Sequence, residues 1–210
     1  MEAAAPRTEP ATARAGQTGT ADAILDAALA ETLAHGIRRT SIADIARRSG
    51  VSRQTIYRYW PDAQSVFASL VTREVIAQIP ADAADPGPAS SLDGLVAVLV
   101  DAADRVRRLE IVDRLRETDP ELFARYILGR LGTSQRHVHA ALAAHVRRGQ
   151  TAGTVRAGDA DQRAAMLLLV LQSAVQSAPL VAEWLDEDGW RRELSGAVRG
   201  MLQRSDAGSP

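Results

Sequence analysis

Residues 41–60, SIADIARRSGVSRQTIYRYW, decide how the N-terminal third of this chain folds. Ser41 can cap a first helix, with the aspartate three residues later as its partner in a capping box. Gly50 suits the left-handed position that ends a helix, because it has no Cβ to clash. Ser52 then caps a second short helix that turns Ile56 inward. Two short helices joined by a tight turn make the helix-turn-helix pattern, in which the second helix is free to present its outer side chains.

The outer side chains of this second helix determine what the pattern can bind. They are Arg53, Gln54, Thr55, Tyr57, Arg58 and Tyr59. None is acidic, and each offers a hydrogen-bond donor or a flat ring to phosphates or base edges. Residues 38–58 contain six arginines and one aspartate, although the whole chain carries a formal net charge of −1. A local basic patch on a nearly neutral protein is the electrostatic footprint of nucleic-acid binding. We therefore predict DNA contacts from Ser41 and these six residues; the plainer alternative is a solvated arginine face.

From Ile24 to Val71 the sequence resembles the N-terminal domain of TetR/AcrR-type transcriptional regulators. The matching run is HG at residues 35–36, followed by TSIADIARRSGVSRQTIYRYWPDAQSVF. The sequence departs from the family at Ala63, where a lysine that contacts a phosphate is usual, and at Gln54, where glycine is common. The resemblance implies a three-helix DNA-binding head on a helical body that binds a small-molecule effector and forms dimers.

The chain divides by composition into three segments. Residues 1–20 are rich in alanine, proline, threonine and glycine and are expected to form a disordered arm. Residues 21–62 are expected to form the helix-turn-helix domain, beginning with a helix at about 21–34. Residues 63–205 are expected to form a helical regulatory and dimerisation domain. The chain has no cysteine, which excludes disulfides and thiol catalysis, and every Lys+Arg position is arginine.

The C-terminal two thirds of the chain predict helices only. Expected segments are 92–109 with an extension at 111–116, one opening at 119–121, one from 133 or 134 to 148, one at 159–177 and one at 189–203. We expect no strands, no repeat and no span of about 20 apolar residues that a membrane would need. With the N-terminal helices, this gives an all-α fold.

The segment MLLLVL at residues 166–171 is apolar on every side of a helix. Such a helix must be covered all round, and a partner subunit related by two-fold symmetry is the simplest cover. We predict a homodimer interface around Leu168, Leu171, Val198 and Met201. In the resembling family, the last two helices usually form an intersubunit four-helix bundle. The alternative is a central helix buried within its own domain.

Few constellations in the sequence indicate chemistry. His137 and His139 are two residues apart, so on a helix they point in different directions and cannot chelate one ion. We therefore expect no metal, no cofactor and no catalytic site. The large side chains that could line an effector pocket in the body are Phe67, Leu70, Phe123, Tyr126 and Trp184. The plainer interpretation of each is an ordinary core residue.

The function that these observations predict is a ligand-responsive transcriptional regulator in the cytoplasm. It would be a repressor that binds double-stranded DNA at a palindromic operator as a homodimer, without membrane or enzymatic activity. One alternative is a helical small-molecule carrier or enzyme whose DNA-binding head is vestigial. Another is an interaction module whose basic helix binds an acidic protein; salt-dependent, sequence-selective duplex binding would separate it from a regulator.

Overall fold

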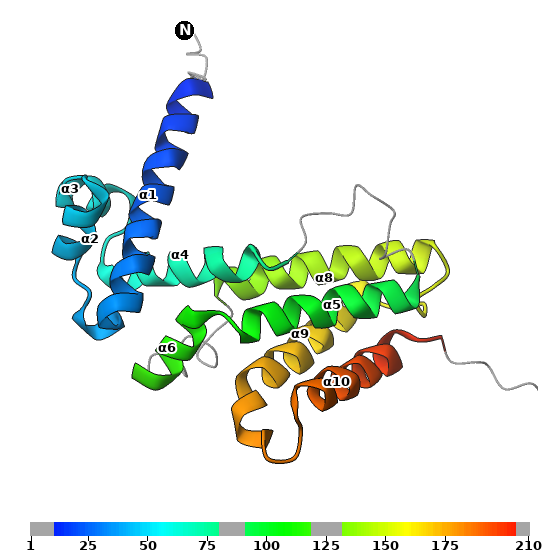
Figure 1. Ribbon diagram of the computed structural model, residues 1–210. Helices are drawn as coiled ribbons and strands as arrows, with labels where there is room; N and C mark the ends of the chain where they lie inside the picture. The colour runs from blue at the N-terminus through cyan, green and yellow to red at the C-terminus, as the bar shows by residue number, and fades with distance from the viewer. Residues whose placement is uncertain (1–10, 80–90, 119–131, 205–210) are drawn as a thin grey trace, which may run out of the picture. The chain divides into compact units, whose positions relative to one another are not determined.

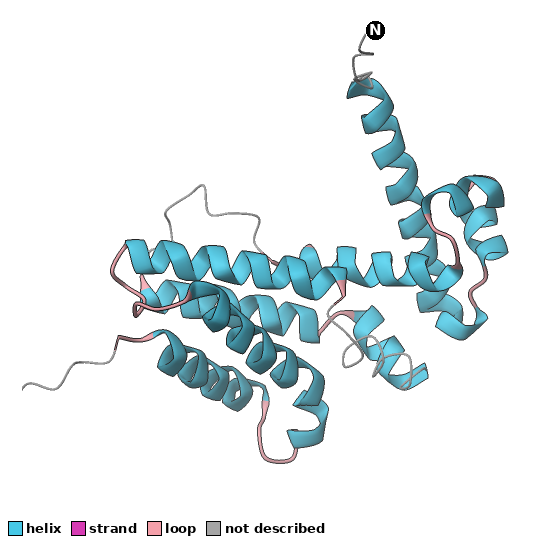
Figure 2. Cartoon of the chain, turned by 180° about the vertical axis from the view of Figure 1, so that it is seen from behind, coloured by secondary structure: helices cyan, strands magenta, loops and turns pink. Residues whose placement is uncertain are grey.

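The computed structural model describes residues 11–79, 91–118 and 132–204. Within these ranges the chain forms nine α-helices and two short 3-10 helices, with no strand (Figures 1 and 2). The predicted all-α fold is confirmed. The chain has two compact units, one made of residues 1–70 and 114–120 and the other of residues 71–113 and 121–210. The helix predicted to open at residues 119–121 lies outside the described residues.

Helix α1 (Ala11–His35) is the base of the first unit and packs against α2 (Ile42–Ser49). Its buried side chains are Ile24, Leu25, Ala27, Ala28, Glu31 and Thr32. Gly36 ends α1 with a φ of 80°, a conformation that favours glycine. The 3-10 helix η1 (Ile37–Arg39) then leads into α2, and the Thr40 hydroxyl donates to the Gly36 carbonyl at 3.0 Å.

The expected disordered arm over residues 1–20 is corrected for residues 11–20, which form the first turns of α1. Residues 1–10 lie outside the described residues. Lengthening an existing helix needs no new nucleus, so the buried part of α1 supports its extension towards the N-terminus. The alanines in residues 11–20 are also strong helix formers.

The first unit continues to Leu70, beyond the expected boundary at residue 62. Helix α4 (Ala63–Ile76) begins in this unit, and its side chains Val66, Phe67 and Leu70 are buried. The Trp60 indole N–H donates to the Ser69 hydroxyl at 2.8 Å, which ties the start of α4 to the end of the helix-turn-helix. Burial of these α4 side chains explains why the break falls later than the sequence composition suggests.

Four helices form the core of the second unit: α5 (Leu92–Arg107), α8 (Thr133–Thr151), α9 (Ala160–Ser177) and α10 (Glu187–Leu202). Helix α9 packs against the other three, and α10 also packs against α5. Ala143, Val146, Leu167, Val198 and Leu202 are almost fully buried in this core. Helix α6 (Glu110–Thr118) follows α5, and the short 3-10 helix η3 (Ala178–Val181) continues from α9.

Helix α9 with η3 corrects the expectation about apolar spans. The segment Ala160–Val181 is long and apolar enough to cross a membrane, by length and composition alone. No charged residue lies between Arg163 and Glu183, although glutamines and serines interrupt the apolar run and hide it from simple inspection. Because Leu167, Leu168 and Leu171 are buried among α5, α8 and α10, we interpret the segment as a core helix.

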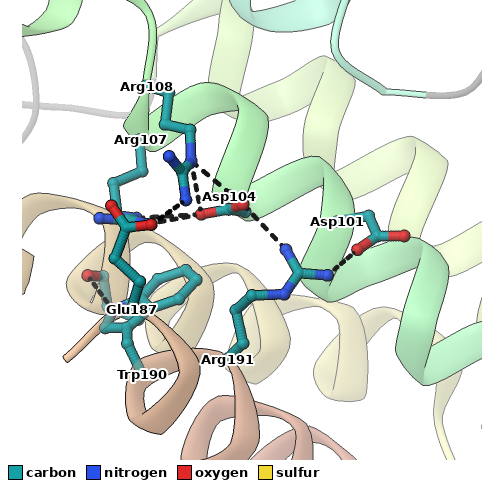
Figure 3. A network of polar contacts seen from close by, with 8 residues as sticks. Asp101, Asp104, Arg107, Arg108, Glu187, Trp190 and Arg191 are labelled. Carbon is teal, nitrogen blue, oxygen red and sulfur yellow. Dashed lines mark hydrogen bonds and ion pairs between the residues drawn. The ribbon is translucent and has the colours of Figure 1, made fainter. Parts of the chain in front are cut away.

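A carboxylate joins α5 to α10 in the second unit (Figure 3). Buried Asp104 accepts hydrogen bonds from Arg107 at 2.7 Å, from Arg108 at 3.2 Å and from Arg191 at 2.8 Å. Burial raises the pKa of the Asp104 carboxyl, but the hydrogen bonds from Arg107 and Arg108 outweigh it and hold the pKa below its ordinary value. Asp104 is therefore ionised and paired in the folded unit.

The arginines around Asp104 make further contacts that extend the network. Arg191 also pairs with Asp101, and the Arg107 guanidinium lies 4.8 Å from the centre of the Trp190 ring (Figure 3). The Trp190 indole N–H donates to the carbonyl of Ala174 on α9 at 3.2 Å. The network thus connects α5, α9 and α10 at the edge of the apolar core.

Candidate nucleic-acid interface

Helix α2 is closed at both ends by the signals in its sequence. Its capping box is present: Ser41 Oγ accepts from the Asp44 backbone N–H at 3.3 Å, and the Asp44 carboxylate accepts from the Ser41 backbone N–H at 3.2 Å. Hydrogen bonds from the Ser41 hydroxyl and then its backbone hold the pKa of Asp44 below its ordinary value. Gly50 takes a φ of 71° in the left-handed region and ends the helix. The predicted bounds and caps of α2 are confirmed.

Helix α3 (Arg53–Tyr59) follows after a short turn and packs against α2. Ser52 Oγ accepts from the Thr55 backbone N–H at 3.0 Å and so caps the helix, as predicted. Ile56 is the one residue of α3 that is buried, and its exposed fraction is 0%. A helix with one inward anchor leaves most of its circumference available to a partner.

The outer face of α3 carries the side chains predicted to contact DNA. Arg53, Gln54 and Arg58 are exposed, and 52% of Tyr57 is exposed. Among the described residues, the side chains of Arg53 and Gln54 have no hydrogen-bond or ion-pair partner. Their donors are therefore available at the N-terminal end of α3, where backbone N–H groups also attract anions.

Two of the predicted residues are less accessible than the others. Thr55 is half-buried, and its hydroxyl lies 2.9 Å from the Ser52 hydroxyl. Tyr59 is also half-buried, with its ring 5.5 Å from that of Trp60 and 5.3 Å from the Arg58 guanidinium carbon. The aromatic pair and the indole bond to α4 fix the C-terminal end of α3.

Two of the six arginines in residues 38–58 are already neutralised. Arg47 pairs with Asp44 at 2.9 Å, and the Nε of Arg48 donates to Glu31 at 2.7 Å. Glu31 is buried, and its other oxygen lies 3.5 Å from His35. Glu31 is a functional neighbour not predicted above, although a glutamate on the apolar face of α1 signals a buried charge that needs a partner. The other four arginines lie outside these two pairs, Arg38 and Arg39 on η1 and Arg53 and Arg58 on α3.

The start of α4 shows what the departure at Ala63 means. Asp62 caps α4, since its carboxylate accepts from the Ser65 backbone N–H at 2.7 Å. Ala63 is the first residue of the helix and offers no side-chain donor. A lysine at this position would add a charge to a helix N-terminus, where backbone N–H groups already favour anions.

Comparison with known proteins agrees with this geometry. Residues 24–70 match the bacterial regulatory proteins of the tetR family. The chain is also 40% identical over 182 residues to an uncharacterized HTH-type transcriptional regulator of Mycobacterium tuberculosis, a match that covers 85% of this chain and 92% of the relative. A regulator of Mycobacterium bovis with the same description matches to the same extent. This chain belongs to the TetR family of transcriptional regulators. The family is one of DNA-binding regulators and not of enzymes.

Solved structures show that the TetR-family fold extends over most of the chain, beyond the residues that match the family model. A TetR-family regulator from Pectobacterium atrosepticum aligns with a TM-score of 0.62 at 21% identity, covering 94% of this chain and 100% of that one. SmeT, the repressor of the Stenotrophomonas maltophilia multidrug efflux pump SmeDEF, aligns with a TM-score of 0.58 at 20% identity, covering 92% and 95%. A SmeT–triclosan complex aligns with a TM-score of 0.54 at 19% identity, covering 91% and 95%.

The residues predicted to line an effector pocket are divided between the two units of this TetR-family chain, and their grouping stays a prediction. Phe67 and Leu70 are buried in the first unit, whereas Trp184 is 74% exposed in the second. Phe123 and Tyr126 lie outside the described residues. His137 and His139 are on α8, and no group of three potential metal ligands comes together within the described part of the chain.

The residues predicted to form the dimer interface lie largely inside the second unit. Leu168, Leu171 and Val198 belong to its buried core, and Met201 packs against that core. The exposed apolar residues of α9 are instead Met166, at 53%, and Leu169, at 59%. The sequence could not distinguish these faces because α9 is apolar all round. A partner would cover Met166 and Leu169, because the side chains of Leu168, Leu171 and Val198 are already buried within their own chain.

Proposed function

We propose that this TetR-family regulator is a ligand-responsive repressor that binds a palindromic operator as a homodimer. The observation that carries the proposal is the outer face of α3. It has no acidic residue, and it keeps Arg53 and Gln54 exposed and unpaired while the neighbouring Arg47 and Arg48 are neutralised. A surface that leaves donors unpaired in the free protein is suited to a polyanionic partner.

The proposed contacts follow from the position of each side chain on α3. With the N-terminal end of the helix in the major groove, Arg53 and Gln54 would lie nearest the base edges, where arginine pairs with guanine and glutamine with adenine. Thr55 would lie beside them. Tyr57, Arg58 and Tyr59 would contact phosphates from the far end of α3, and Ser41 would do so from the N-terminus of α2.

The proposed dimer uses the exposed faces of α9 and α10. Met166 and Leu169 expose large apolar side chains on α9. On α10, Gly196 and Gly200 are exposed, and a Cβ at either would meet no atom within 4 Å. Glycine in an exposed helix costs about 1 kcal/mol of stability relative to alanine. Close approach of a helix from the partner subunit would explain why glycine occupies these two positions. Two linked heads about 34–36 Å apart would then read two half-sites of a palindrome.

The proposed regulation is a shift between two arrangements of the dimer. The effector would bind more tightly to the arrangement in which the spacing of the two heads does not match the operator. At saturation it lowers operator affinity by the ratio of its affinities for the two arrangements. SmeT, which shares the fold, is a repressor and forms a complex with triclosan. We propose the same type of control here, with the first unit as the DNA-binding domain and the second unit as the regulatory domain, in the cytoplasm where the DNA is.

Selection of bound duplexes from a random pool tests the proposal. We expect an enriched palindrome, bound by two protomers per duplex in light scattering, with an affinity that falls steeply as salt rises. Binding without sequence preference, or a single protomer saturating the palindrome, would overturn it. Capture of an acidic protein instead of DNA would favour the interaction-module alternative.

A further inference from the structure

The second unit contains a pocket whose lining residues are not among those assigned above to DNA binding or to the dimer. Its volume is ≈ 390 Å³, and its lining residues are Arg156, Ala157, Arg163 and Arg204. The arginines come from three places: the loop between α8 and α9, the first turn of α9, and the residues just after α10. None of the lining residues is acidic.

Arg163 is held in place by backbone carbonyls rather than by a carboxylate. One terminal nitrogen donates to the Met201 carbonyl at 3.0 Å and the other to the Ala157 carbonyl at 2.9 Å. Its Nε is buried without a partner. Burial, and then the nearby charge of Arg156, lower the pKa of Arg163 from its ordinary value. The guanidinium is thus positioned, but its charge is not neutralised.

The two aspartates that lie between Arg156 and Arg163 in the sequence are engaged elsewhere. Asp159 caps α9 by accepting from the backbone N–H groups of Asp161 and Gln162, and Asp161 pairs with Arg147 at 2.9 Å. Among the described residues, the guanidinium of Arg156 has no hydrogen-bond partner.

The third arginine of the pocket is bound only weakly by the protein. Arg204 makes one hydrogen bond, at 3.3 Å, to the carbonyl of Gly153. Three guanidinium groups therefore surround one pocket with no carboxylate from the described chain among them. Placing like charges together is unfavourable unless an anion neutralises them.

We propose that this pocket binds the phosphoryl group of a small phosphorylated compound. Guanidinium groups are planar forks of N–H donors that match the oxygens of a phosphate, and their charge persists at neutral pH. A phosphoryl group carries close to two negative charges, which suits several arginines better than one carboxylate does. The pocket volume falls within the range of about 300–1,000 Å³ typical of small-molecule sites, so there is room for more than phosphate alone. This site is independent of the proposed operator and dimer.

Calorimetric titration of the full chain with pyrophosphate tests the site. Arg156→Gln and Arg204→Gln each remove one exposed guanidinium, and we expect each to weaken pyrophosphate binding about ten-fold, the effect of losing one charge-assisted hydrogen bond. Arg163 is left unchanged because it also holds two backbone carbonyls. The matched control is Arg136→Gln. Arg136 is an exposed arginine on α8 that does not line the pocket, so this variant should bind pyrophosphate as the wild type does.

Three results would overturn the proposal. One is that the full chain does not bind pyrophosphate. This holds even if a chain shortened by residues 205–210 does bind it, because the pocket would then be filled by the protein's own C-terminal residues. Another is equal binding by the two pocket variants and the control. The last is a loss of duplex binding in Arg156→Gln as large as in Arg53→Ala, which would make the pocket part of the DNA site. Arg53→Ala itself should bind pyrophosphate as the wild type does.

Discussion

Helix α3 carries the proposed DNA contacts and helix α9 the proposed dimer contacts. The two helices differ in whether the face that binds a partner can be recognised from the sequence. Helix α3 buries Ile56 alone, so its outer face follows from the sequence. Helix α9 buries Leu167, Leu168 and Leu171 and yet exposes Leu169, all within one apolar run. The difference shows that polarity marks a surface only where a helix is amphipathic. An apolar helix needs tertiary contacts before its free side can be assigned.

The largest expected effect separates two adjacent leucines of α9. Leu168→Glu places a charge in the core, and we expect it to lower the unfolding free energy of the second unit by more than about 4 kcal/mol. Leu169→Glu places the same charge on the exposed side, and we expect a folded protein that is monomeric in light scattering. Urea unfolding followed by helical circular dichroism measures the first effect. The comparison fails if Leu169→Glu remains a dimer, or if the two variants behave alike.

The contrast extends to charge, because α5 and α10 pair their arginines while α3 does not. Asp104→Asn removes the buried carboxylate that Arg107 and Arg191 share, although Arg191 keeps its pair with Asp101, and we expect a loss of about 3 kcal/mol in unfolding free energy. Asp101→Asn is the control, since Asp101 is more exposed and should cost less than about 1 kcal/mol. Equal losses in the two variants would show that burial does not govern the network.

A smaller effect concerns the phosphate contact that Ala63 lacks. Ala63→Lys places a cation in the first turn of α4, and we expect tighter binding to every duplex, with a salt dependence steeper by roughly one phosphate contact. The measurement is the affinity for specific and unrelated duplexes at several salt concentrations. An unchanged slope would mean that the start of α4 does not face the DNA backbone.

The smallest expected effect is a pH dependence at the cap of α2, which supports α3. The pKa of Asp44 is lowered in the folded state, so its contribution to stability is present above the unfolded pKa of 3.8 and is lost as the pH falls through the lower folded value. We expect the stability difference between wild type and Asp44→Asn to shrink as the pH falls below about 4. A difference that is constant from pH 7 to pH 3 would show that the carboxylate does not support the cap.

Sequence reasoning succeeded where local chemistry sets the structure. Capping residues Ser41 and Ser52 and the glycine at position 50 place α2 and α3 almost to the residue. Each of these signals acts on backbone groups within a few residues. The predicted helix over residues 159–177 likewise begins after its cap at Asp159 and ends at Ser177.

Sequence reasoning failed where distant segments meet. The pairing of Arg48 with Glu31 joins α2 to α1, and the pairing of Arg191 with Asp104 joins α10 to α5. Neither spacing is local, so no periodicity reveals it. The exposure of Trp184 likewise depends on tertiary surroundings that its aromatic character does not reveal. The buried and exposed sides of α9 depend on contacts with three other helices.

The central claim is that the unpaired side chains of α3 read the bases of an operator. Its most direct test compares wild type, Arg53→Ala and Arg136→Ala in binding to the selected palindrome and to single-base-pair variants of it. Arg136 is the control, an exposed arginine on α8, outside both the recognition helix and the proposed dimer faces. We predict that Arg53→Ala loses about 1–3 kcal/mol of discrimination at one base pair in each half-site, while its unfolding free energy and the behaviour of Arg136→Ala stay as in the wild type. Unchanged discrimination in Arg53→Ala would contradict the assignment of α3 as the recognition helix.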